Sequence, residues 1–290
     1  MATPYPTCYL NGAYLPLADA RISPLDRGFL FADGVYEVVP VNRGRPFRLR
    51  EHLKRLDDSL RSIRVTNPHS DEQWLAILER LAAEAGSNEA LVYVQVTRGA
   101  EFGRNHLFPK DATPTVFAFV NPFPQPSAAT LERGLSAVTL EDIRWDRCDI
   151  KSVALLGNVL LRQEAADAGA DEALLVRDGL LLEGSSSSVF LCIGGKLVTP
   201  PNSHRILPGT SRDAVLELAE GWLPYEICSL EAREIHSCEE AWIASAGRGV
   251  LPVTRVDGEP VGDGHPGPLW SEMYARLQQH LDDIATTPAL

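Results

Sequence analysis

Residues 148–190 read CDIKSVALLGNVLLRQEAADAGADEALLVRDGLLLEGSSSSVF. Within this stretch, residues 156–169 have the composition and spacing of a helix. The apolar runs at 172–176, 180–184 and 188–193 are short and β-rich, which is typical of buried strands. Helical and strand-like segments alternate, so we expect an α/β fold class built as mixed α+β lobes.

The same mixture continues on both sides of this stretch. Asn11-Gly12 predicts a tight hairpin turn, and a second hairpin is expected to turn between Asn42 and Gly44. Residues 51–63 place Leu53, Leu56, Leu60 and Ile63 on one helical face. A second helix is expected to start at Ser70-Asp71 and to stop at Gly86.

Residues 121–129 read NPFPQPSAA, and three prolines in this run suit a stiff, extended connector. We therefore predict an N-terminal α+β small domain (1–120), an interdomain linker (121–127) and a C-terminal α/β large domain (128–290). The C-terminal domain would carry Lys151.

The chain has a net charge of −12, which argues against nucleic acid or an anionic membrane surface as its main partner. We see neither a signal peptide nor a run of about 18 apolar residues, so we expect a cytoplasmic protein without a membrane span. The five cysteines are scattered and form no CxxC pair. We therefore expect reduced thiols and no metal site.

Only four of the basic residues are lysines, so a catalytic amine has few candidates. Lys54 is expected on the solvated face of a helix, Lys110 in a polar loop and Lys196 in a Gly-Gly-Lys turn. Lys151 lies between apolar residues just before a helix, where a desolvated amine could act as a nucleophile. The same context also suits a lysine that simply extends to solvent, so local sequence leaves both interpretations open.

Three further features could serve a cofactor. A carboxylate at Glu183, buried against a ring nitrogen, would keep that nitrogen protonated. The hydroxyl run Ser185–Ser188 and the helix start Gly209-Thr210-Ser211 could hold a phosphate. Taken singly, each is also explained as a turn carboxylate, a turn and a helix cap.

In order and spacing, these segments together resemble the fold-type IV pyridoxal-phosphate enzymes, and most closely the D-amino-acid transaminases. The resemblance extends from about Tyr9 to Gly258 and includes the spacing between Lys151 and Glu183. The segments that carry it are DRGFLFADGVYEVV (26–39), EHLKRL (51–56), VTRG with RNH (96–106), EDIRWDRCDIKS (141–152), EALLVRDGLLLEGSSSSVF (172–190), ILPGTSRD (206–213) and LPVTRVDG (251–258).

The resemblance implies a two-domain fold and pyridoxal 5'-phosphate held through a Schiff base to Lys151. It also implies transamination between D-amino acids and 2-oxo acids, of the type D-alanine plus 2-oxoglutarate. The cofactor-binding residues that it implies are Arg55, Glu183, Ser186, Leu207, Gly209, Thr210, Ser211 and Ala246. Tyr36, Arg104 and His106 would bind the substrate α-carboxylate, and the last two would come from the second subunit of a homodimer.

Two departures from the family pattern concern single positions. The run GAEFGRNH is one residue longer before Arg104 than we expect. In SAGRG (245–249), Ala246 offers only its backbone where the family often has a hydroxyl. Arg248 is unexpected there, and it is either a surface residue or an extension of the positive lining toward acidic substrate side chains.

Other activities remain open within the same fold: a branched-chain transaminase, an (R)-amine transaminase or an aminodeoxychorismate lyase. A pyridoxal-phosphate carrier or a non-catalytic interaction protein is the alternative outside catalysis. The D preference follows from the resemblance alone.

Overall fold

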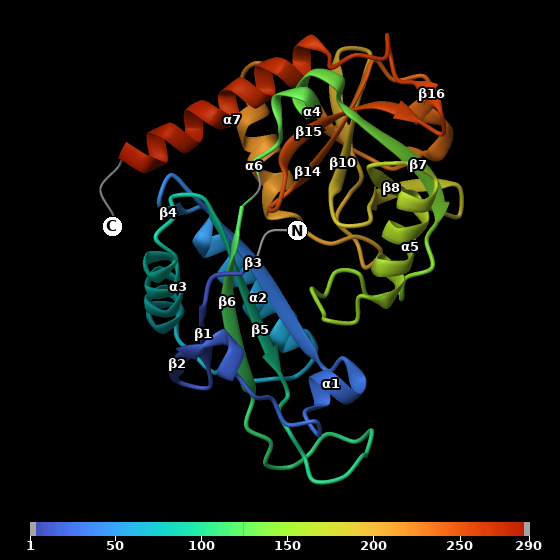
Figure 1. The fold of residues 1–290 in the computed structure, drawn as a ribbon. Coiled ribbons are helices and arrows are strands. Elements are labelled where there is room, and N and C mark those ends of the chain that lie inside the picture. The colour runs from blue at the N-terminus through green and yellow to red at the C-terminus, as the bar shows by residue number, and fades with distance from the viewer. Residues whose placement is uncertain (1–3, 124, 287–290) are drawn as a thin grey trace. The chain divides into compact units, whose positions relative to one another are not determined.

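The computed structural model describes residues 4–123 and 125–286. They form two compact units, which are described separately (Figure 1). The first unit contains residues 4–123, 150–154 and 284–286, and the second contains residues 125–149 and 155–283.

The segment 150–154 joins the first unit through strand β3 (Gly34–Asn42). Tyr36 N donates to Lys151 O at 2.9 Å, and Val153 N donates to Gly34 O at 3.0 Å. Lys151 therefore packs with the first unit, whereas the division expected from the sequence puts it in the C-terminal domain.

The first unit is built on a six-stranded sheet in the order β2-β1-β6-β5-β3-β4, with every neighbouring pair antiparallel. The predicted turn at Asn11-Gly12 is confirmed: both residues have positive φ, 48° and 94°, as a two-residue hairpin requires. The second hairpin also turns where expected, through Arg43 and Gly44. Besides β3, the strands are β1 (Thr7–Leu10), β2 (Ala13–Pro16), β4 (Arg45–Pro46), β5 (Ala90–Thr97) and β6 (Thr115–Pro122).

Two amphipathic helices, α2 (Leu49–Ser62) and α3 (Asp71–Ala85), bury their apolar faces in the core of this unit. The predicted face of α2 is confirmed, because Leu53, Leu56 and Leu60 are buried. Ser70 and Gln73 form a capping box at the start of α3, and Gly86 ends that helix in the left-handed region. The remaining short elements are η1 (Leu17–Asp19) and α1 (Arg27–Phe31).

The second unit contains a ten-stranded mixed sheet in the order β12-β11-β10-β14-β15-β7-β8-β9-β13, with β16 paired to β15. The pairs β15–β7, β7–β8 and β11–β12 are parallel. The strands are β7 (Leu135–Glu141), β8 (Glu172–Arg177), β9 (Leu180–Gly184), β10 (Ser188–Ile193), β11 (Lys196–Thr199), β12 (Tyr225–Ile227), β13 (Leu230–Glu231), β14 (Glu240–Ser245), β15 (Gly249–Val256) and β16 (Glu259–Pro260).

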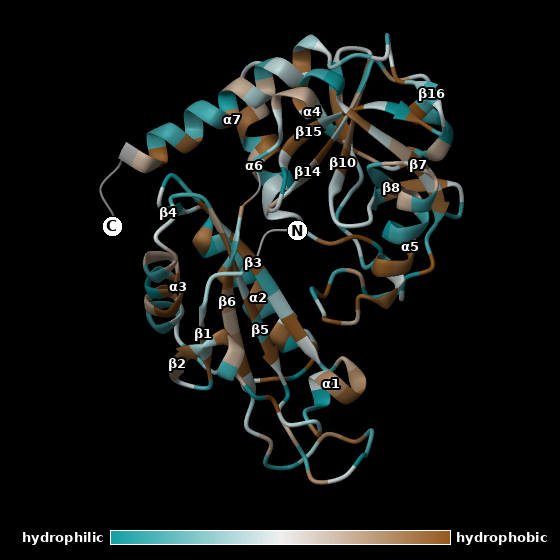
Figure 2. Cartoon of the chain, viewed as in Figure 1, coloured by the Kyte–Doolittle hydropathy of each residue, from teal (hydrophilic) through white to brown (hydrophobic). Residues whose placement is uncertain are grey.

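The helices of the second unit are α4 (Ala128–Arg133), α5 (Leu156–Asp167), α6 (Thr210–Ala219), η2 (Ala232–His236) and α7 (Pro268–Thr286). Trp270, Met273, Leu277 and Leu281 of α7 are buried at helical spacing. Figure 2 shows hydrophilic and hydrophobic residues interspersed along this helix, as expected for one that is buried on a single side. None of the described helices combines the length and the apolar character needed to cross a membrane.

Candidate active site

Lys151 is held by its backbone at β3. Its carbonyl accepts from Tyr36 N, and its own N–H donates to Ser59 Oγ at 3.2 Å. The Nζ atom lies 4.2 Å from the centroid of the Tyr36 ring. The amine is therefore placed over an aromatic face by a fixed stretch of main chain. Among the predicted residues of the first unit, the structure brings Lys151 together with Tyr36.

Arg55, on α2, is fixed by a buried carboxylate that the sequence analysis missed. Glu37 accepts from Arg55 Nε at 2.7 Å and from Arg55 Nη2 at 2.9 Å, and it lies 2.7 Å from His52 Nδ1. Burial alone would raise the pKa of Glu37, but Arg55 and His52 hold it well below its usual value. Burial lowers the pKa of His52, so the cluster consists of an anionic Glu37, a cationic Arg55 and a neutral His52 near pH 7.

Arg104 and His106 lie in the exposed loop between β5 and β6. Both contact Phe31, the last residue of α1: Arg104 Cζ is 4.8 Å from the ring centroid, and the His106 ring packs edge-on at 5.4 Å. Phe31 therefore gathers the two predicted carboxylate-binding side chains on one aromatic ring.

Buried Arg27 fixes the main chain of this loop. Its Nη1 donates to the carbonyls of Asn105 at 2.6 Å and Leu107 at 3.3 Å, and its Nη2 donates to the His106 carbonyl at 3.4 Å. Arg27 Nε also pairs with Asp33 Oδ2 at 2.9 Å. The spacing of charged residues in the sequence did not reveal this role for Arg27.

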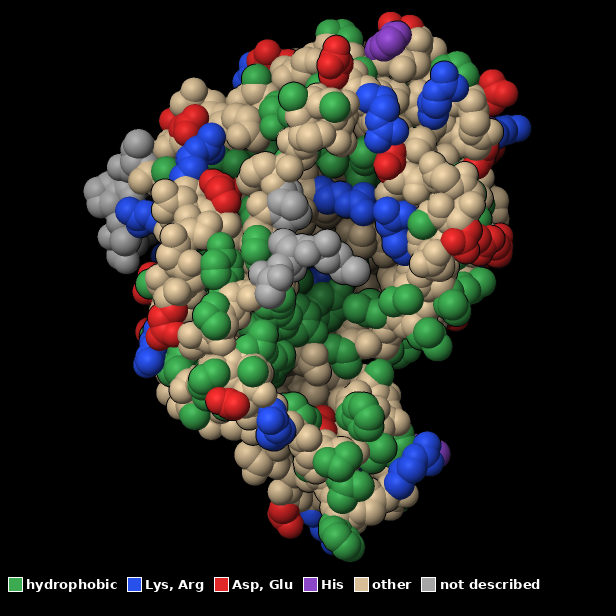
Figure 3. All heavy atoms as spheres, viewed as in Figure 1, with side chains coloured by type: hydrophobic (Ala, Val, Ile, Leu, Met, Phe, Trp, Pro, Cys, Tyr) green, Lys and Arg blue, Asp and Glu red, His purple; other side chains and the backbone are tan. Residues whose placement is uncertain are grey.

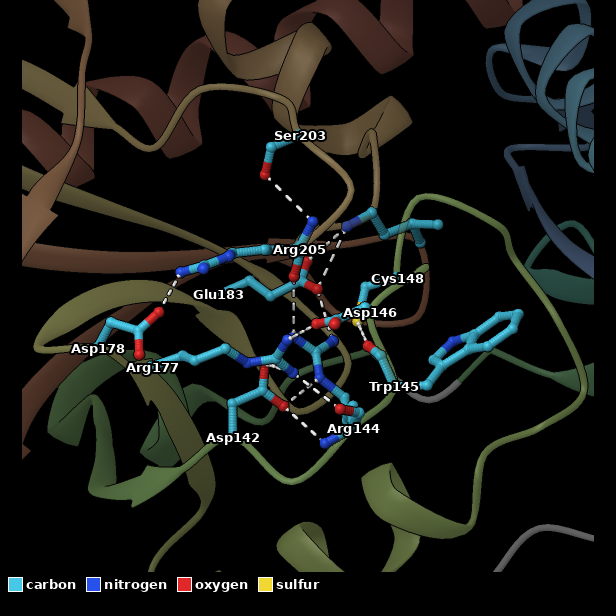
Figure 4. Close-up of polar contacts among 11 residues, drawn as sticks. Asp142, Arg144, Trp145, Asp146, Cys148, Arg177, Asp178, Glu183, Ser203 and Arg205 are labelled. Atoms are coloured by element: carbon cyan, nitrogen blue, oxygen red, sulfur yellow. Dashed lines mark hydrogen bonds and ion pairs between the residues drawn. The ribbon is translucent and has the colours of Figure 1, made fainter.

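In the second unit, Glu183 is buried near the end of β9. Arg144 Nη1 donates to its Oε1 at 2.6 Å, and Leu207 N donates to both carboxylate oxygens at 3.2 Å (Figure 4). Burial raises the pKa of Glu183, and Arg144 opposes this shift. A carboxylate has about four lone-pair sites, so Glu183 can still accept from a ring N–H.

Leu207 thus contacts the predicted site residue Glu183 through its backbone N–H. Three residues later begins α6, whose first amides have no partner within the helix. Gly209 packs closely against Ser188, because a Cβ on Gly209 would lie 2.5 Å from Ser188 Oγ. The predicted residues Gly209, Thr210 and Ser211 therefore form a close-packed helix start that can receive an anion.

The first three serines of the hydroxyl run differ in their surroundings. Ser185 Oγ donates to Glu172 at 2.5 Å and Ser187 Oγ donates to it at 3.2 Å, whereas Ser186 is exposed. Of Ser185, Ser186 and Ser187, Ser186 is therefore the one whose hydroxyl does not donate to Glu172. It is also the one that the sequence assigned to the cofactor.

Ala246 and Arg248 lie in the turn between β14 and β15. Arg248 Nη1 donates to Glu172 Oε2 at 3.1 Å, and its side chain is 30% exposed. Arg248 is therefore an ion-paired residue of this turn.

Five charged or ionisable residues that contact the predicted residues or their neighbours were not predicted: Arg27, Glu37, His52, Arg144 and Glu172. For Glu37 a signal was present, because a single carboxylate interrupts the apolar strand sequence GVYEVVPV. For Arg27, Arg144 and Glu172, a decisive partner lies far away along the chain: Asn105, Glu183 and Arg248. Among the described residues, no group of His, Cys, Asp or Glu side chains is arranged to hold a metal ion.

Comparison with known proteins identifies the class. The family model described as "Amino-transferase class IV" matches residues 34–256. The D-alanine aminotransferase of Bacillus licheniformis is 38% identical over 272 residues, which cover 93% of this chain and 95% of that protein. The D-alanine aminotransferase of Staphylococcus haemolyticus is 33% identical over 276 residues, covering 94% and 97%. The chain belongs to the class IV aminotransferase family, which makes it an enzyme.

Solved structures agree on the fold. A fold IV transaminase from Curtobacterium pusillum, CpuTA1, is 26% identical, with a TM-score of 0.81 over 93% of this chain and 92% of that one. The branched-chain amino acid aminotransferase from Escherichia coli has a TM-score of 0.84 at 22% identity, over 92% and 91%. The family and the fold-type IV architecture predicted from the sequence are thereby confirmed.

Proposed function

We propose that this protein transfers the amino group of D-amino acids, D-alanine among them, to a 2-oxo acid such as 2-oxoglutarate, with pyridoxal 5'-phosphate as cofactor. Relatives named D-alanine aminotransferase support this choice over nearly the whole chain. The observation that carries it is the geometry of Glu183, a buried carboxylate oriented by Arg144 and Leu207 with acceptor capacity to spare.

The donor set fits this cofactor. Lys151 would bind its aldehyde carbon, and Glu183 would accept from its ring nitrogen. We assign its phosphate to Arg55, Ser186, the backbone of Ala246 and the helix start Gly209–Ser211, and we assign packing against its ring to Leu207. When bound, pyridoxal phosphate stabilises the negative charge left on the substrate α-carbon by drawing electrons into the protonated ring.

The protein supplies the proton transfers and the orientation. Lys151 Nζ would act as the general base that takes the proton from the substrate α-carbon and as the acid that passes this proton on to the cofactor. The backbone contacts of Lys151 with Tyr36 and Ser59 limit where that amine can move. Glu183, with its raised pKa, is a strong acceptor for a ring N–H and favours the protonated ring.

Tyr36, Arg104 and His106 would select substrates that carry an α-carboxylate. Arginine offers a permanently charged, forked donor to a carboxylate, and the phenol and the imidazole add donors that fix its orientation. The contacts of Phe31 and Arg27 with residues 104–107 hold Arg104 and His106 in place before substrate arrives.

We further propose a homodimer in which Arg104 and His106 serve the site of the second subunit. Large apolar side chains are exposed beside this loop, with Phe29 77%, Phe102 100% and Leu107 74% exposed. Figure 3 shows hydrophobic side chains gathered over α1 and the loop between β5 and β6. A patch of this kind is typical of a surface that a partner covers.

All five cysteines are free thiols, which suits the cytoplasm, where we place the protein.

A donor panel tests the proposed activity. The purified enzyme, loaded with pyridoxal phosphate, is given D-alanine, L-leucine or (R)-1-phenylethylamine, and conversion of the cofactor to its amine form is followed by absorbance. We expect D-alanine to convert it fastest. Preference for L-leucine or for the simple amine would replace the proposal with a branched-chain or an (R)-amine transaminase. No conversion by any donor would support a cofactor carrier.

A further inference from the structure

Glu172, at the start of β8, is fully buried and is not among the residues assigned above to the cofactor or to the substrate. Its Oε1 accepts from Ser185 Oγ at 2.5 Å and from Ala173 N at 3.0 Å. Its Oε2 accepts from Ser187 Oγ at 3.2 Å and from Arg248 Nη1 at 3.1 Å. Four donors from three separate stretches of chain therefore converge on one carboxylate.

These contacts join two loops that flank predicted cofactor residues. Ser185 and Ser187 lie on either side of Ser186, so their bonds to Glu172 fix the loop while Ser186 stays exposed. The loop is tight, since Gly184 N donates to Ser187 O at 2.7 Å and a Cβ on Gly184 would lie 2.2 Å from Ser187 Oγ.

The second loop is the turn between β14 and β15. Arg248 lies two residues after Ala246, and its own N–H donates to Ser245 O at 3.3 Å. The bond from its guanidinium to Glu172 therefore ties this turn to the start of β8. The backbone amide of Ala246, which the sequence assigns to phosphate, is carried by the turn that this ion pair anchors.

The ion pair also bears on the two roles considered for Arg248, which were a surface residue and a part of the positive lining for acidic substrate side chains. Glu172 is the charged partner of Arg248, and a buried carboxylate is costly without a cation beside it. The guanidinium of Arg248 is thus engaged by Glu172 within the protein, and we therefore do not assign it to a second carboxylate on a substrate side chain.

We infer that Glu172 is a positioning residue that, with Arg248, holds the Ser185–Ser188 loop and the 245–249 turn in the geometry that receives the cofactor phosphate. This inference rests on the proposed pyridoxal-phosphate function. It assigns Arg248 to cofactor binding through Glu172, and it removes Arg248 from the selection of acidic substrates.

The test is titration of the apoprotein with pyridoxal phosphate and, separately, with pyridoxal, which lacks the phosphate. Binding is followed by tryptophan fluorescence, and thermal unfolding of each apoprotein is recorded in parallel. Glu172→Gln should bind pyridoxal phosphate at least about tenfold more weakly, the scale on which residues that orient ligands through hydrogen bonds act in other sites. Its affinity for pyridoxal should change much less.

Arg248→Ala should show the same selective loss, and it keeps the inference testable if Glu172→Gln does not fold. Glu272→Gln is the matched control, because Glu272 is paired with Arg276 on the exposed face of α7. This control should bind both ligands as the wild type does. Equal weakening of both ligands by Glu172→Gln or Arg248→Ala, or no weakening, would overturn the inference.

A second arm tests the substrate claim on Arg248. The ratio of kcat/KM for D-aspartate to that for D-alanine should be the same in Arg248→Ala as in the wild type. A selective loss of D-aspartate would overturn the assignment and return Arg248 to the substrate pocket. Failure of the wild-type apoprotein to bind pyridoxal phosphate at all would overturn the proposed function itself. Normal binding by the wild type and by both variants would overturn only the inference about Glu172 and Arg248.

Discussion

Arg144 Nη1 donates to Glu183 Oε1 at 2.6 Å, and Arg144 Nε donates to Asp142 Oδ1 at 2.9 Å. Asp142 in turn pairs with Arg177 at 2.9 Å, so acids and bases alternate along a buried chain (Figure 4). Burial alone would lower the pKa of Arg144, but Asp142 and Glu183 raise it, which keeps the guanidinium charged. The permanent charge of Arg144 thus limits how far burial can raise the pKa of Glu183.

Replacing Arg144 by glutamine should therefore raise the pKa of Glu183 further. More of the carboxyl is then protonated near pH 7, and it becomes a poorer partner for a protonated ring. Each unit of pKa corresponds to about 1.4 kcal/mol, so a shift of one unit should weaken the interaction of ionised Glu183 with a protonated ring roughly tenfold, and kcat should fall. The acid limb of the rate profile with D-alanine should move to higher pH. Arg147→Gln, which removes an exposed guanidinium paired with Asp149, is the control and should leave the profile in place.

The sequence predicted those parts of the structure that depend on neighbours along the chain. The hairpin at Asn11-Gly12 needs only two residues that tolerate positive φ, and α3 needs only its cap at Ser70 and its stop at Gly86. The apolar face of α2 follows from helical spacing. These signals are local, so they can be detected without knowledge of the fold.

Apart from Glu37, the positioning residues could not be predicted, because their decisive partners come from elsewhere in the chain. Arg144 and Glu183 are 39 positions apart, and Arg27 and Asn105 are 78 apart. Whether such a charge is buried and paired, or solvated, depends on tertiary packing and leaves no periodic pattern. The attachment of Lys151 to β3 was missed for the same reason, since its bonds to Tyr36 and Ser59 are long-range contacts.

The Glu37–His52 pair predicts how stability depends on pH. Both groups have pKa values below their ordinary values of 4.5 and 6.5. The unfolded chain therefore binds more protons, and stability is lost as pH falls, first below about 6.5 for His52 and then below about 4.5 for Glu37. The free energy of unfolding of the apoprotein in urea should decrease in these two ranges.

The variant His52→Gln should show a smaller decrease between pH 6.5 and 5. Some slope should remain, because the pKa of His69 is also lowered. Glu37→Gln should destabilise the protein by about 3–5 kcal/mol at pH 7, as expected when one partner of a buried ion pair is removed. The comparison of the two proteins isolates His52, because groups such as Glu183, whose raised pKa acts in the opposite sense, are present in both. The same change in unfolding free energy between pH 7 and pH 5 in His52→Gln as in the wild type would contradict the assignment of a neutral, buried His52.

Phe31→Leu tests the aromatic contact beneath Arg104 and His106. Loss of a cation–π contact costs about 1 kcal/mol, so KM for D-alanine should rise roughly fivefold. The rate with (R)-1-phenylethylamine, which has no carboxylate, should change little. Tyr14→Leu is the matched control, since it removes the contact of Arg80 with the Tyr14 ring, 3.6 Å away. Equal effects of Phe31→Leu on both donors would mean that the ring supports the fold and does not orient the carboxylate donors.

Mixed dimers test whether Arg104 acts on its own subunit or on the second one. Lys151→Ala should be inactive as a homodimer and Arg104→Ala strongly impaired with D-alanine. In a dimer with one subunit of each kind, one site would combine an intact Lys151 with an intact Arg104 from the other subunit. Such dimers, isolated with two affinity tags, should recover about half of the wild-type activity, because one of two equivalent sites is complete.

If Arg104 instead served its own subunit, the mixed dimer would have one site without its lysine and one without its arginine. Its activity would then be about half that of the Arg104→Ala homodimer, because one of its two sites is inactive. The control pairs Lys151→Ala with Glu183→Gln. We assign both residues to the same subunit's site, so neither site of that dimer is complete and no recovery is expected. Recovery in the first pair but not in the second would locate Arg104, and not Glu183, in the site of the second subunit. It would also explain why the loop that carries Arg104 exposes the apolar side chains of Phe102 and Leu107.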